Sequence, residues 1–234
     1  MKFKTELHCH SARVSACGTM TDEELLEKYI AGGYTSVVLT NHLSRFTFGA
    51  DKKAPYRGSD DWQEKMDHYF AGIEALRKAA NGRVHVLWGV EICLNGTRSD
   101  YLVHGLGEDF YRANPDLLDI DVKTLSARVR EAGGLLYQAH PFRNHMSVTP
   151  PELLDGIEIH NGHPGHDSRN DVAAAWAEKF SLRAICGSDL HHMEHTPNTA
   201  ILTDAPITTI EELLAVLRTG HYELVREGAP GEDK

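Results

Sequence analysis

Short apolar runs alternate along this chain with longer amphipathic stretches. The apolar runs are rich in β-branched residues and predict buried strands over residues 3–7, 36–40, 84–90, 101–103, 135–138, 156–159, 183–186 and 199–202. Between several of them, apolar residues recur at helical spacing, as in Trp62, Met66, Phe70 and Ile73. This alternation predicts an α/β protein with a mostly parallel sheet.

Local signals mark where the predicted helices begin and end. Thr21 and Glu24 have the spacing of a capping box, and Asp121 can cap another helix. A helix is expected across roughly residues 168–180, and another begins at Thr208-Thr209. Asn95-Gly96 is a hairpin-type turn signal. Residues 44–58 have no clear period and predict a long loop.

Polar residues capable of binding metal follow many of the predicted strands. They are His8 and His10, His42, Glu91, His104, His140, and Asp189 with His191. In a closed barrel of parallel strands, all carboxyl ends face one mouth, where barrel enzymes place their catalytic groups. An open sheet would spread these side chains along an edge. The pattern therefore favours an irregular barrel of about seven strands with a metal cluster at its C-terminal face.

Length and composition narrow the function classes. The chain has 234 residues, a formal net charge of −10 and four cysteines. We expect one domain over residues 1–226 and a frayed tail over 227–234. The acidic balance argues against broad binding of long nucleic acids. The apolar runs are too short for a transmembrane helix, the first residues lack the apolar core of a signal peptide, and the cysteines are scattered. We therefore expect a reduced cytoplasmic protein without a membrane partner.

The chemistry of the predicted cluster indicates divalent metal ions. Imidazole and carboxylate ligands suit Zn²⁺, Mn²⁺ or Fe²⁺. The candidate ligands exceed the needs of one ion, so we expect two or three. Glu91 ends an apolar strand and has no cationic partner near it in the sequence, which makes it the natural bridging ligand.

Six motifs, in order along nearly the whole chain, carry a resemblance to a known family. They are His8-Cys9-His10-Ser11, Leu39-Thr40-Asn41-His42, Gly89-Val90-Glu91, Ala139-His140-Pro141, Gly156-Ile157-Glu158-Ile159-His160-Asn161 and Gly187-Ser188-Asp189-Leu190-His191. This set resembles the polymerase-and-histidinol-phosphatase (PHP) superfamily of metal-dependent phosphoesterases.

The resemblance implies a distorted (β/α)7 barrel and assigns ligands to two or three ions. His8, His10, Glu91 and Asp189 would hold the first, and Glu91, His140 and His104 the second. His42 and His191 would hold a third, together with a residue from the loop after His10. In that loop many relatives carry Asp or His, whereas this chain has Cys17, whose thiolate would be a good zinc ligand. In the second motif, Asn41 stands where an Asp is common.

These features predict a hydrolase that cleaves a small phosphate ester, most simply a monoester, with an ion-activated water as nucleophile. Glu91, Asp189 and His191 are the expected catalytic residues. Arg143 and His160 are the expected substrate-binding residues, and His191 or His160 would protonate the leaving group. His163 and His166 are expected on the substrate side of the site or in solvent.

Three other functions stay open. The chain could be a 3′–5′ nucleotidase or exonuclease acting on short nucleic acid. It could hydrolyse a C–N or ester bond, because similar metal barrels do so. It could also be a non-catalytic metal-binding module. The sequence leaves the oligomeric state open.

Overall fold

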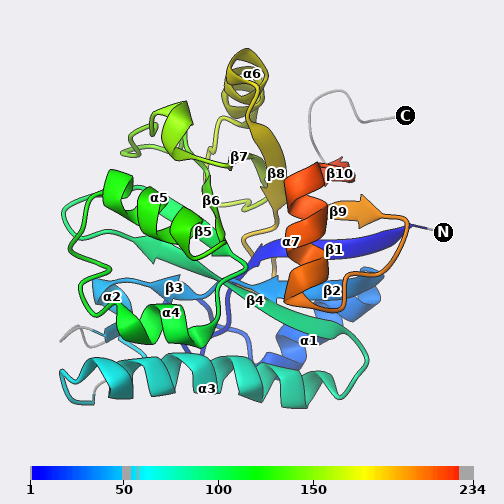
Figure 1. The fold of residues 1–234 in the computed structure, drawn as a ribbon. Coiled ribbons are helices and arrows are strands. Elements are labelled where there is room, and N and C mark those ends of the chain that lie inside the picture. The colour runs from blue at the N-terminus through cyan, green and yellow to red at the C-terminus, as the bar shows by residue number, and fades with distance from the viewer. Residues whose placement is uncertain (1, 49–53, 57, 227–234) are drawn as a thin grey trace.

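The strands form one ten-stranded mixed sheet in a computed structural model that describes residues 2–48, 54–56 and 58–226 (Figure 1). Its order is β10-β9-β1-β2-β4-β5-β6-β7-β8, with β3 paired to β4. The strands are β1 (Phe3–Cys9), β2 (Tyr34–Leu39), β3 (His42–Leu43), β4 (His85–Cys93), β5 (Asp100–His104), β6 (Leu135–Gln138), β7 (Gly156–Asn161), β8 (Arg183–Gly187), β9 (Thr199–Thr203) and β10 (Glu223–Arg226).

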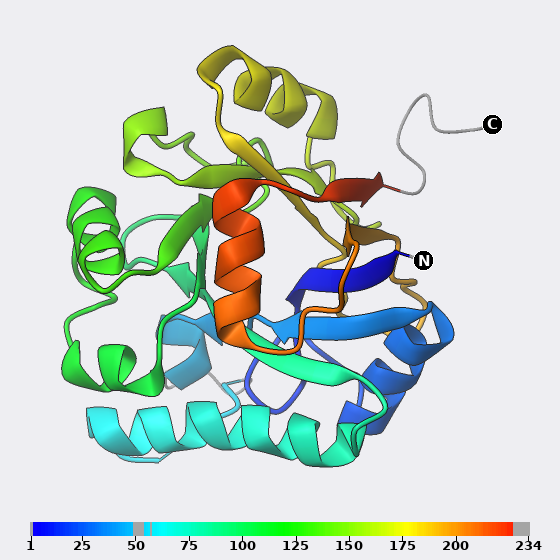
Figure 2. The same ribbon diagram turned by 45° about the vertical axis from the view of Figure 1, so that its right-hand side comes forward.

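Seven of these strands, β1, β2, β4, β5, β6, β7 and β8, curl into a nearly closed barrel (Figure 2). The seam lies between the chain just after β8 and the end of β1. There Cys9 and Leu190 form a parallel bridge, and the Asp189 amide donates to the His8 carbonyl at 2.9 Å. The prediction of an irregular barrel of about seven strands is confirmed.

The barrel is less parallel than the sequence predicted. β5 runs antiparallel to both β4 and β6, and β9 runs antiparallel to β1 and β10. The start of β5 therefore lies beside the end of β4, where Asp100 is opposite Cys93. Because β5 is reversed, its carboxyl end lies at the opposite end of the barrel from the carboxyl ends of β1, β4 and β8.

Seven helices of the described residues lie around the strands. They are α1 (Asp22–Ala31), α2 (Arg45–Phe48), α3 (Trp62–Ala80), α4 (Glu108–Ala113), α5 (Val122–Glu131), α6 (Asn170–Phe180) and α7 (Ile210–Thr219), with a 3-10 turn at Pro151–Leu153. Of these, α1, α5 and α7 begin at the predicted capping residues. Thr21 and Thr209 each form a capping box. α3 ends where Asn81 adopts the left-handed conformation at φ 48°.

Apolar side chains fill the barrel end that faces α7. Leu7, Val38, Leu87, Leu102 and Tyr137 form one buried cluster with Leu213 and Leu217 of α7. The Ser36 hydroxyl also donates to the carbonyl of Ile207, just before α7. α7 thus covers one end of the barrel, and the polar ends of β1, β4 and β8 lie at the other.

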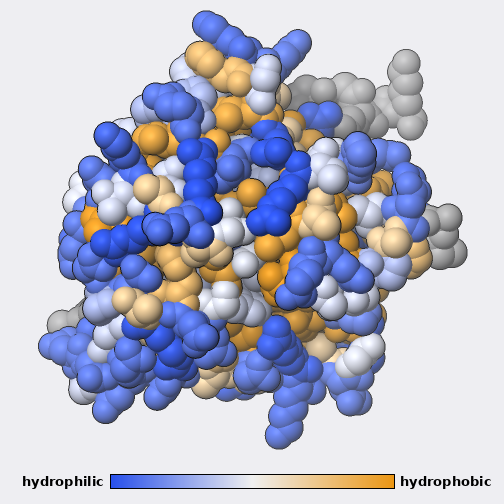
Figure 3. Space-filling view, viewed as in Figure 1, coloured by the Kyte–Doolittle hydropathy of each residue, from blue (hydrophilic) through white to orange (hydrophobic). Residues whose placement is uncertain are grey.

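Some elements were not predicted. α2 forms inside the expected loop over residues 44–58, part of which lies outside the described residues. The segments that form α4 and β10 are too short for their apolar residues to show a clear period. The predicted frayed tail, residues 227–234, lies outside the described residues. No helix in the described part of the chain is long and apolar enough to cross a membrane. Figure 3 shows a face whose protruding side chains are mostly hydrophilic, with hydrophobic residues mainly in the hollows between them.

Candidate metal centre

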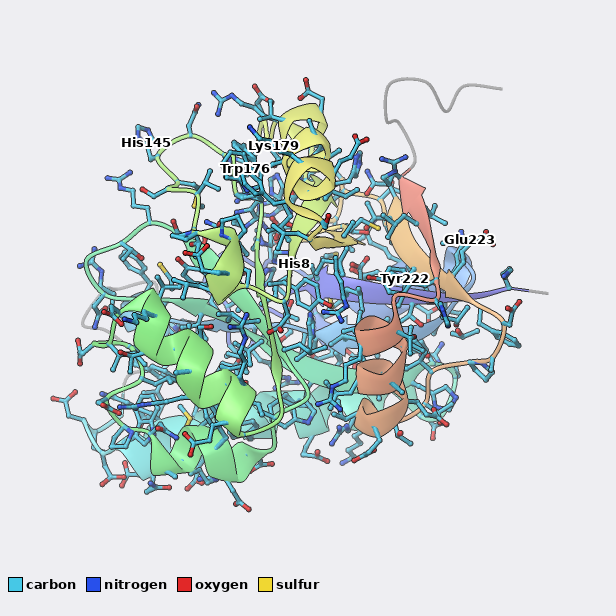
Figure 4. All side chains as sticks on the ribbon, turned by 45° about the horizontal axis from the view of Figure 1, so that its top comes forward. His8, His145, Trp176, Lys179, Tyr222 and Glu223 are labelled. Atoms are coloured by element: carbon cyan, nitrogen blue, oxygen red, sulfur yellow. The ribbon has the colours of Figure 1, made fainter. Side chains whose placement is uncertain are left out.

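Histidines and carboxylates meet inside the barrel mouth, at the end opposite α7. In Figure 4, His8 lies at the centre of the ring of strands, whereas His145 and Glu223 lie at the periphery. Among the described residues, four groups of candidate metal ligands have their ligand atoms within 4.8 Å of one another. These groups are His8, His10 and Glu91; His8, His140 and Asp189; His42, Glu91 and Asp100; and His10, Cys17, His42 and His191.

The first ion's predicted ligands surround one point. The His8 Nε2 atom lies 3.3 Å from Glu91 Oε2 and 3.5 Å from Asp189 Oδ1. The His10 Nε2 atom lies 3.2 Å from each of these oxygens. Two ligands at the tetrahedral angle around an ion, with bonds of about 2.1 Å, are ~3.4 Å apart, so the spacing fits a shared ion.

Hydrogen bonding among the described residues supports this interpretation. His8 Nε2, His10 Nε2 and Glu91 Oε2 are buried and have no hydrogen-bond partner there. Buried polar atoms without partners are costly, and such atoms are rare in native proteins. Several of them aimed at one point indicate a site for an ion that would satisfy them together.

Glu91 presents its second oxygen to a different set of ligands. Its Oε1 lies 3.2 Å from His140 Nε2, which is 4.0 Å from Asp100 Oδ2. Its Oε2 also lies 3.0 Å from His42 Nδ1. The expected bridging position of Glu91 therefore fits the geometry.

His104 does not join this cluster, and its prediction as a ligand of the second ion does not fit the structure. That prediction assumed that every strand ends at the mouth, but β5 is antiparallel to its neighbours, so His104 pairs with Gly89, deeper in the barrel. Both ring nitrogens are buried without a hydrogen-bond partner among the described residues. Burial, with a smaller contribution from His8, lowers the pKa of His104 to about 3. Asp100, at the start of β5, occupies the mouth position instead.

Cys17 does reach the cluster. Its sulfur belongs to the group formed with His10, His42 and His191, which is the expected third site. Burial raises the pKa of the Cys17 thiol, but charge interaction with His42 and hydrogen bonds from His191 and His42 outweigh this and lower it to about 5. A thiolate among three imidazoles is a ligand set that suits zinc.

Asn41 lies behind the cluster and holds the loop that carries Cys17. Its Oδ1 accepts from the Ser11 amide at 2.8 Å and from the Ser15 hydroxyl at 3.1 Å, while its Nδ2 donates to the Ser11 hydroxyl. Ser15 in turn contacts His10 Nδ1 at 3.3 Å and accepts from the His42 amide. The amide in place of the common Asp thus supplies a donor that orders this loop.

Two residues of β7, Glu158 and Asn161, support the candidate ligands through hydrogen bonds. The sequence analysis did not assign either of them to the site. Glu158 Oε1 lies 2.9 Å from His8 Nδ1, and its Oε2 accepts from the His140 amide and from Asn161. Asn161 also donates to Asp189 Oδ2. A carboxylate on Nδ1 fixes the tautomer that leaves Nε2 free for a metal.

The predicted substrate-binding residues have different surroundings. Arg143 donates to Asp189 Oδ2 at 2.9 Å and to Asn161 Oδ1 at 3.2 Å, so it lies at the cluster. His160 belongs to none of the four ligand groups, and its Nδ1 lies 3.2 Å from the Asn170 side chain of α6. His163 Nε2, by contrast, is 3.1 Å from His191 Nδ1. His163 is therefore in contact with a candidate metal ligand.

The electrostatics of the cluster favour cations at its centre. Burial alone would raise the pKa of Glu91 and of Asp189. His42 and His8 keep the pKa of Glu91 well below its usual range, and His8, His10 and His191 do the same for the pKa of Asp189. Burial would lower the pKa of His42, but Glu91 and Cys17 raise it well above its usual value. The carboxylates therefore stay ionised beside positively charged imidazoles, and bound divalent ions would supply that positive charge in their place.

The backbone is strained at two of the candidate ligands. Asp189 has φ 50° and His140 has φ 28°, conformations that non-glycine residues adopt rarely. Such strain clusters at functional sites, where the surrounding structure holds it. Here hydrogen bonds from the Asp189 amide to His8 and from the His140 amide to Glu158 hold the two residues in place.

Comparison with known proteins agrees with this fold. Residues 167–222 match the PHP-associated family. A two-domain protein from Bacteroides vulgatus, containing a predicted PHP-like metal-dependent phosphoesterase, superposes with a TM-score of 0.64 at 18% identity, over 97% of this chain and 65% of that one. The chain thus spans less than two thirds of that relative's length. No curated protein sequence matches.

Two further structures show that the fold serves several chemistries. An amidohydrolase from Chromobacterium violaceum, with bound sulfate and no metal, has a TM-score of 0.55 at 16% identity over 95% of this chain and 97% of that one. A lesion-specific endonuclease from Pyrococcus furiosus has a TM-score of 0.62 at 14% identity over 96% and 58%. The resemblance drawn from the sequence motifs is confirmed: the chain has the fold of the PHP-like metal-dependent phosphoesterases, and its residues 167–222 match the PHP-associated family.

Proposed function

We propose that this protein is a metal-dependent phosphoesterase that hydrolyses a small phosphate monoester. The observation that carries the proposal is the position of Glu91, whose two oxygens face two different sets of histidines and acids within one buried mouth. Two ions sharing a carboxylate are a recurrent arrangement for displacement at phosphorus.

The proposal assigns a ligand role to most of the cluster. His8, His10, Glu91 and Asp189 would hold one ion, and His42, Cys17 and His191 would hold another. Glu91, His140 and Asp100, which the distances of His140 to both acids bring together, would hold a further ion. Bound divalent ions would supply an activated water and a Lewis acid for the phosphoryl oxygens. Zn²⁺, Mn²⁺ and Fe²⁺ all suit these donors.

The chain's own residues would bind the substrate and move its protons. Arg143 is always charged and lies against Asp189, so its guanidinium can bind a phosphoryl oxygen beside the ligands. Its Nε is buried with no hydrogen-bond partner among the described residues. His191 contacts His163 through Nδ1 and Asp189 through Nε2, so it would either hold the third ion or, where that ion is absent, transfer a proton to the leaving oxygen.

The surroundings of the site favour a small substrate. A cavity of about 510 Å³ is lined by Cys17, His42 and Asp100, a volume that fits a small molecule. The net charge of −10 opposes binding of a long polyanion. These features weigh against the polymer substrates of the similar endonuclease.

The proposal can be tested with chelator-treated protein reloaded with Mn²⁺ or Zn²⁺. We expect the reloaded protein to release phosphate from p-nitrophenyl phosphate and Asp189→Asn to lose this activity. Asp109→Asn, which changes an exposed acid of α4, is the matched control and should behave like the unaltered protein. Activity in Asp189→Asn or in metal-free protein would refute the mechanism. Release of amines or cleavage of single-stranded oligonucleotides, without phosphate release from monoesters, would favour the alternatives.

A further inference from the structure

Two arginines line the cavity that contains three of the candidate ligands. Arg45 belongs to α2, just after β3, and Arg98 belongs to the turn between β4 and β5. The same cavity is lined by Cys17, His42 and Asp100. The two guanidinium groups and the candidate metal centre therefore share one space.

Among the described residues, neither arginine has a protein partner for its charge. Within residues 2–48, 54–56 and 58–226, Arg45 and Arg98 make no hydrogen bond or ion pair, whereas Arg143 at the same mouth is bound to Asp189. The Arg45 guanidinium lies over the Phe46 ring, 4.7 Å from its centroid. In a chain with 34 acidic and 24 basic residues, carboxylate partners are plentiful. Two unpaired arginines beside a cavity thus suggest that the partner is a ligand.

The contrast with Arg143, which pairs with Asp189 and is not among the residues that line this cavity, suggests different tasks for Arg143 and for the two cavity arginines. The metal ligands and Arg143 suit the phosphoryl group that reacts. Arg45 in α2 and Arg98 in the turn between β4 and β5 make no hydrogen bond or ion pair with the candidate ligands, so they suit an anion that does not react. Arginine forms paired hydrogen bonds with carboxylate and phosphate oxygens and keeps its charge at every relevant pH.

We propose that Arg45 and Arg98 form a second anion subsite and that the natural substrate is a small phosphate ester bearing a further carboxylate or phosphate. The proposal rests on the phosphoesterase function for the identity of the first anion. The two arginines would then determine specificity, because a substrate without the second anion would leave both of them unpaired.

The proposal can be tested by binding, which does not depend on turnover. Benzylphosphonate and its 3- and 4-carboxy derivatives are not hydrolysed and differ only in the second anion. With zinc-loaded protein, calorimetry should show at least one carboxy derivative binding about tenfold or more tightly than benzylphosphonate. In R45Q/R98Q that advantage should vanish. R83Q, which changes a surface arginine paired with Glu27, is the matched control and should retain it.

Turnover gives a second test that separates this proposal from the proposed function. The ratio of kcat/KM for carboxyphenyl phosphates to that for phenyl phosphate should fall about tenfold in R45Q/R98Q. Hydrolysis of both substrates with the same ratio in all variants would overturn the subsite and leave the phosphoesterase function standing. A loss of the carboxylate advantage in binding, without hydrolysis of either ester, would support the subsite and contradict that function. Equal binding of all three phosphonates to the unaltered protein would overturn the subsite.

Discussion

Glu158 Oε1 lies 2.9 Å from the Nδ1 atom of His8, and both side chains are fully buried. The carboxylate orients the ring and keeps the proton on Nδ1, so Nε2 faces Glu91 and Asp189. The other oxygen of Glu158 accepts from the amide of His140. One residue of β7 thus positions two candidate ligands from β1 and the end of β6.

Replacing Glu158 by Gln should weaken metal binding without removing a ligand. The amide lacks the negative charge that stabilises the His8 Nδ1 proton, and we expect about a 10–100-fold loss of zinc affinity. Competition with a chromogenic chelator measures this. Glu152→Gln changes an exposed glutamate and is the control. Unchanged affinity in Glu158→Gln would show that this contact does not position the ligands.

Asp100 and His104 lie at opposite ends of β5 and should respond differently to substitution. Asp100→Asn removes a charged candidate ligand, so the purified protein should contain fewer ions per chain. His104→Gln should keep the full content, because His104 belongs to none of the ligand groups. Elemental analysis of both variants measures the number of ions per chain. A loss of metal in His104→Gln alone would restore the sequence prediction that His104 is a ligand.

His104 should also make the metal-free fold sensitive to acid. Its folded-state pKa of about 3 lies below its ordinary value of 6.5, so between these values the unfolded chain binds a proton that the folded chain does not. Stability is then lost as pH falls, by about 2 kcal/mol between pH 7 and pH 5 from this group. Urea unfolding at both pH values should show a smaller loss in His104→Gln. An equal loss in both proteins would contradict the buried, neutral state.

Cys17 should be the reactive thiol of the metal-free protein. Its pKa of about 5 makes it a thiolate at pH 7, whereas burial and Asp100 raise the pKa of Cys93 to about 12. Iodoacetamide should therefore modify Cys17 faster than Cys93, and bound Zn²⁺ should protect Cys17. Mass spectrometry of the digested protein measures both sites. Modification of Cys17 at the same rate with and without zinc would remove it from the ligand set.

The sequence predicted those parts of the fold that depend on local pattern. Caps such as Thr21 and Thr209 and the strand before Glu91 follow from residue type and spacing, and the polar strand ends predicted the barrel mouth. The direction of β5 could not be predicted from its sequence pattern, because the alternation of side chains along a strand is the same in either direction. The Asn95-Gly96 turn was the signal that could have placed Asp100 beside Glu91, since a hairpin reverses the chain.

Residues that support the ligands were harder to find. Glu158 lies within an apolar strand, where its role depends on the proximity of His8, 150 residues earlier in the chain. Asn161 lies directly after His160, and a bulge in the pairing of β7 with β8 decides which of the two side chains faces the cluster. Such irregularities arise from tertiary packing and leave no periodic signal.

Anomalous scattering at the zinc and manganese absorption edges, from crystals of metal-loaded protein, tests the metal centre most directly. The structure predicts ions in the barrel mouth, with Glu91 shared by two of them, Asp100 beside His140, and Cys17 on a third with His42 and His191. No anomalous density at this mouth, or an ion bound by His104 in place of Asp100, would contradict it.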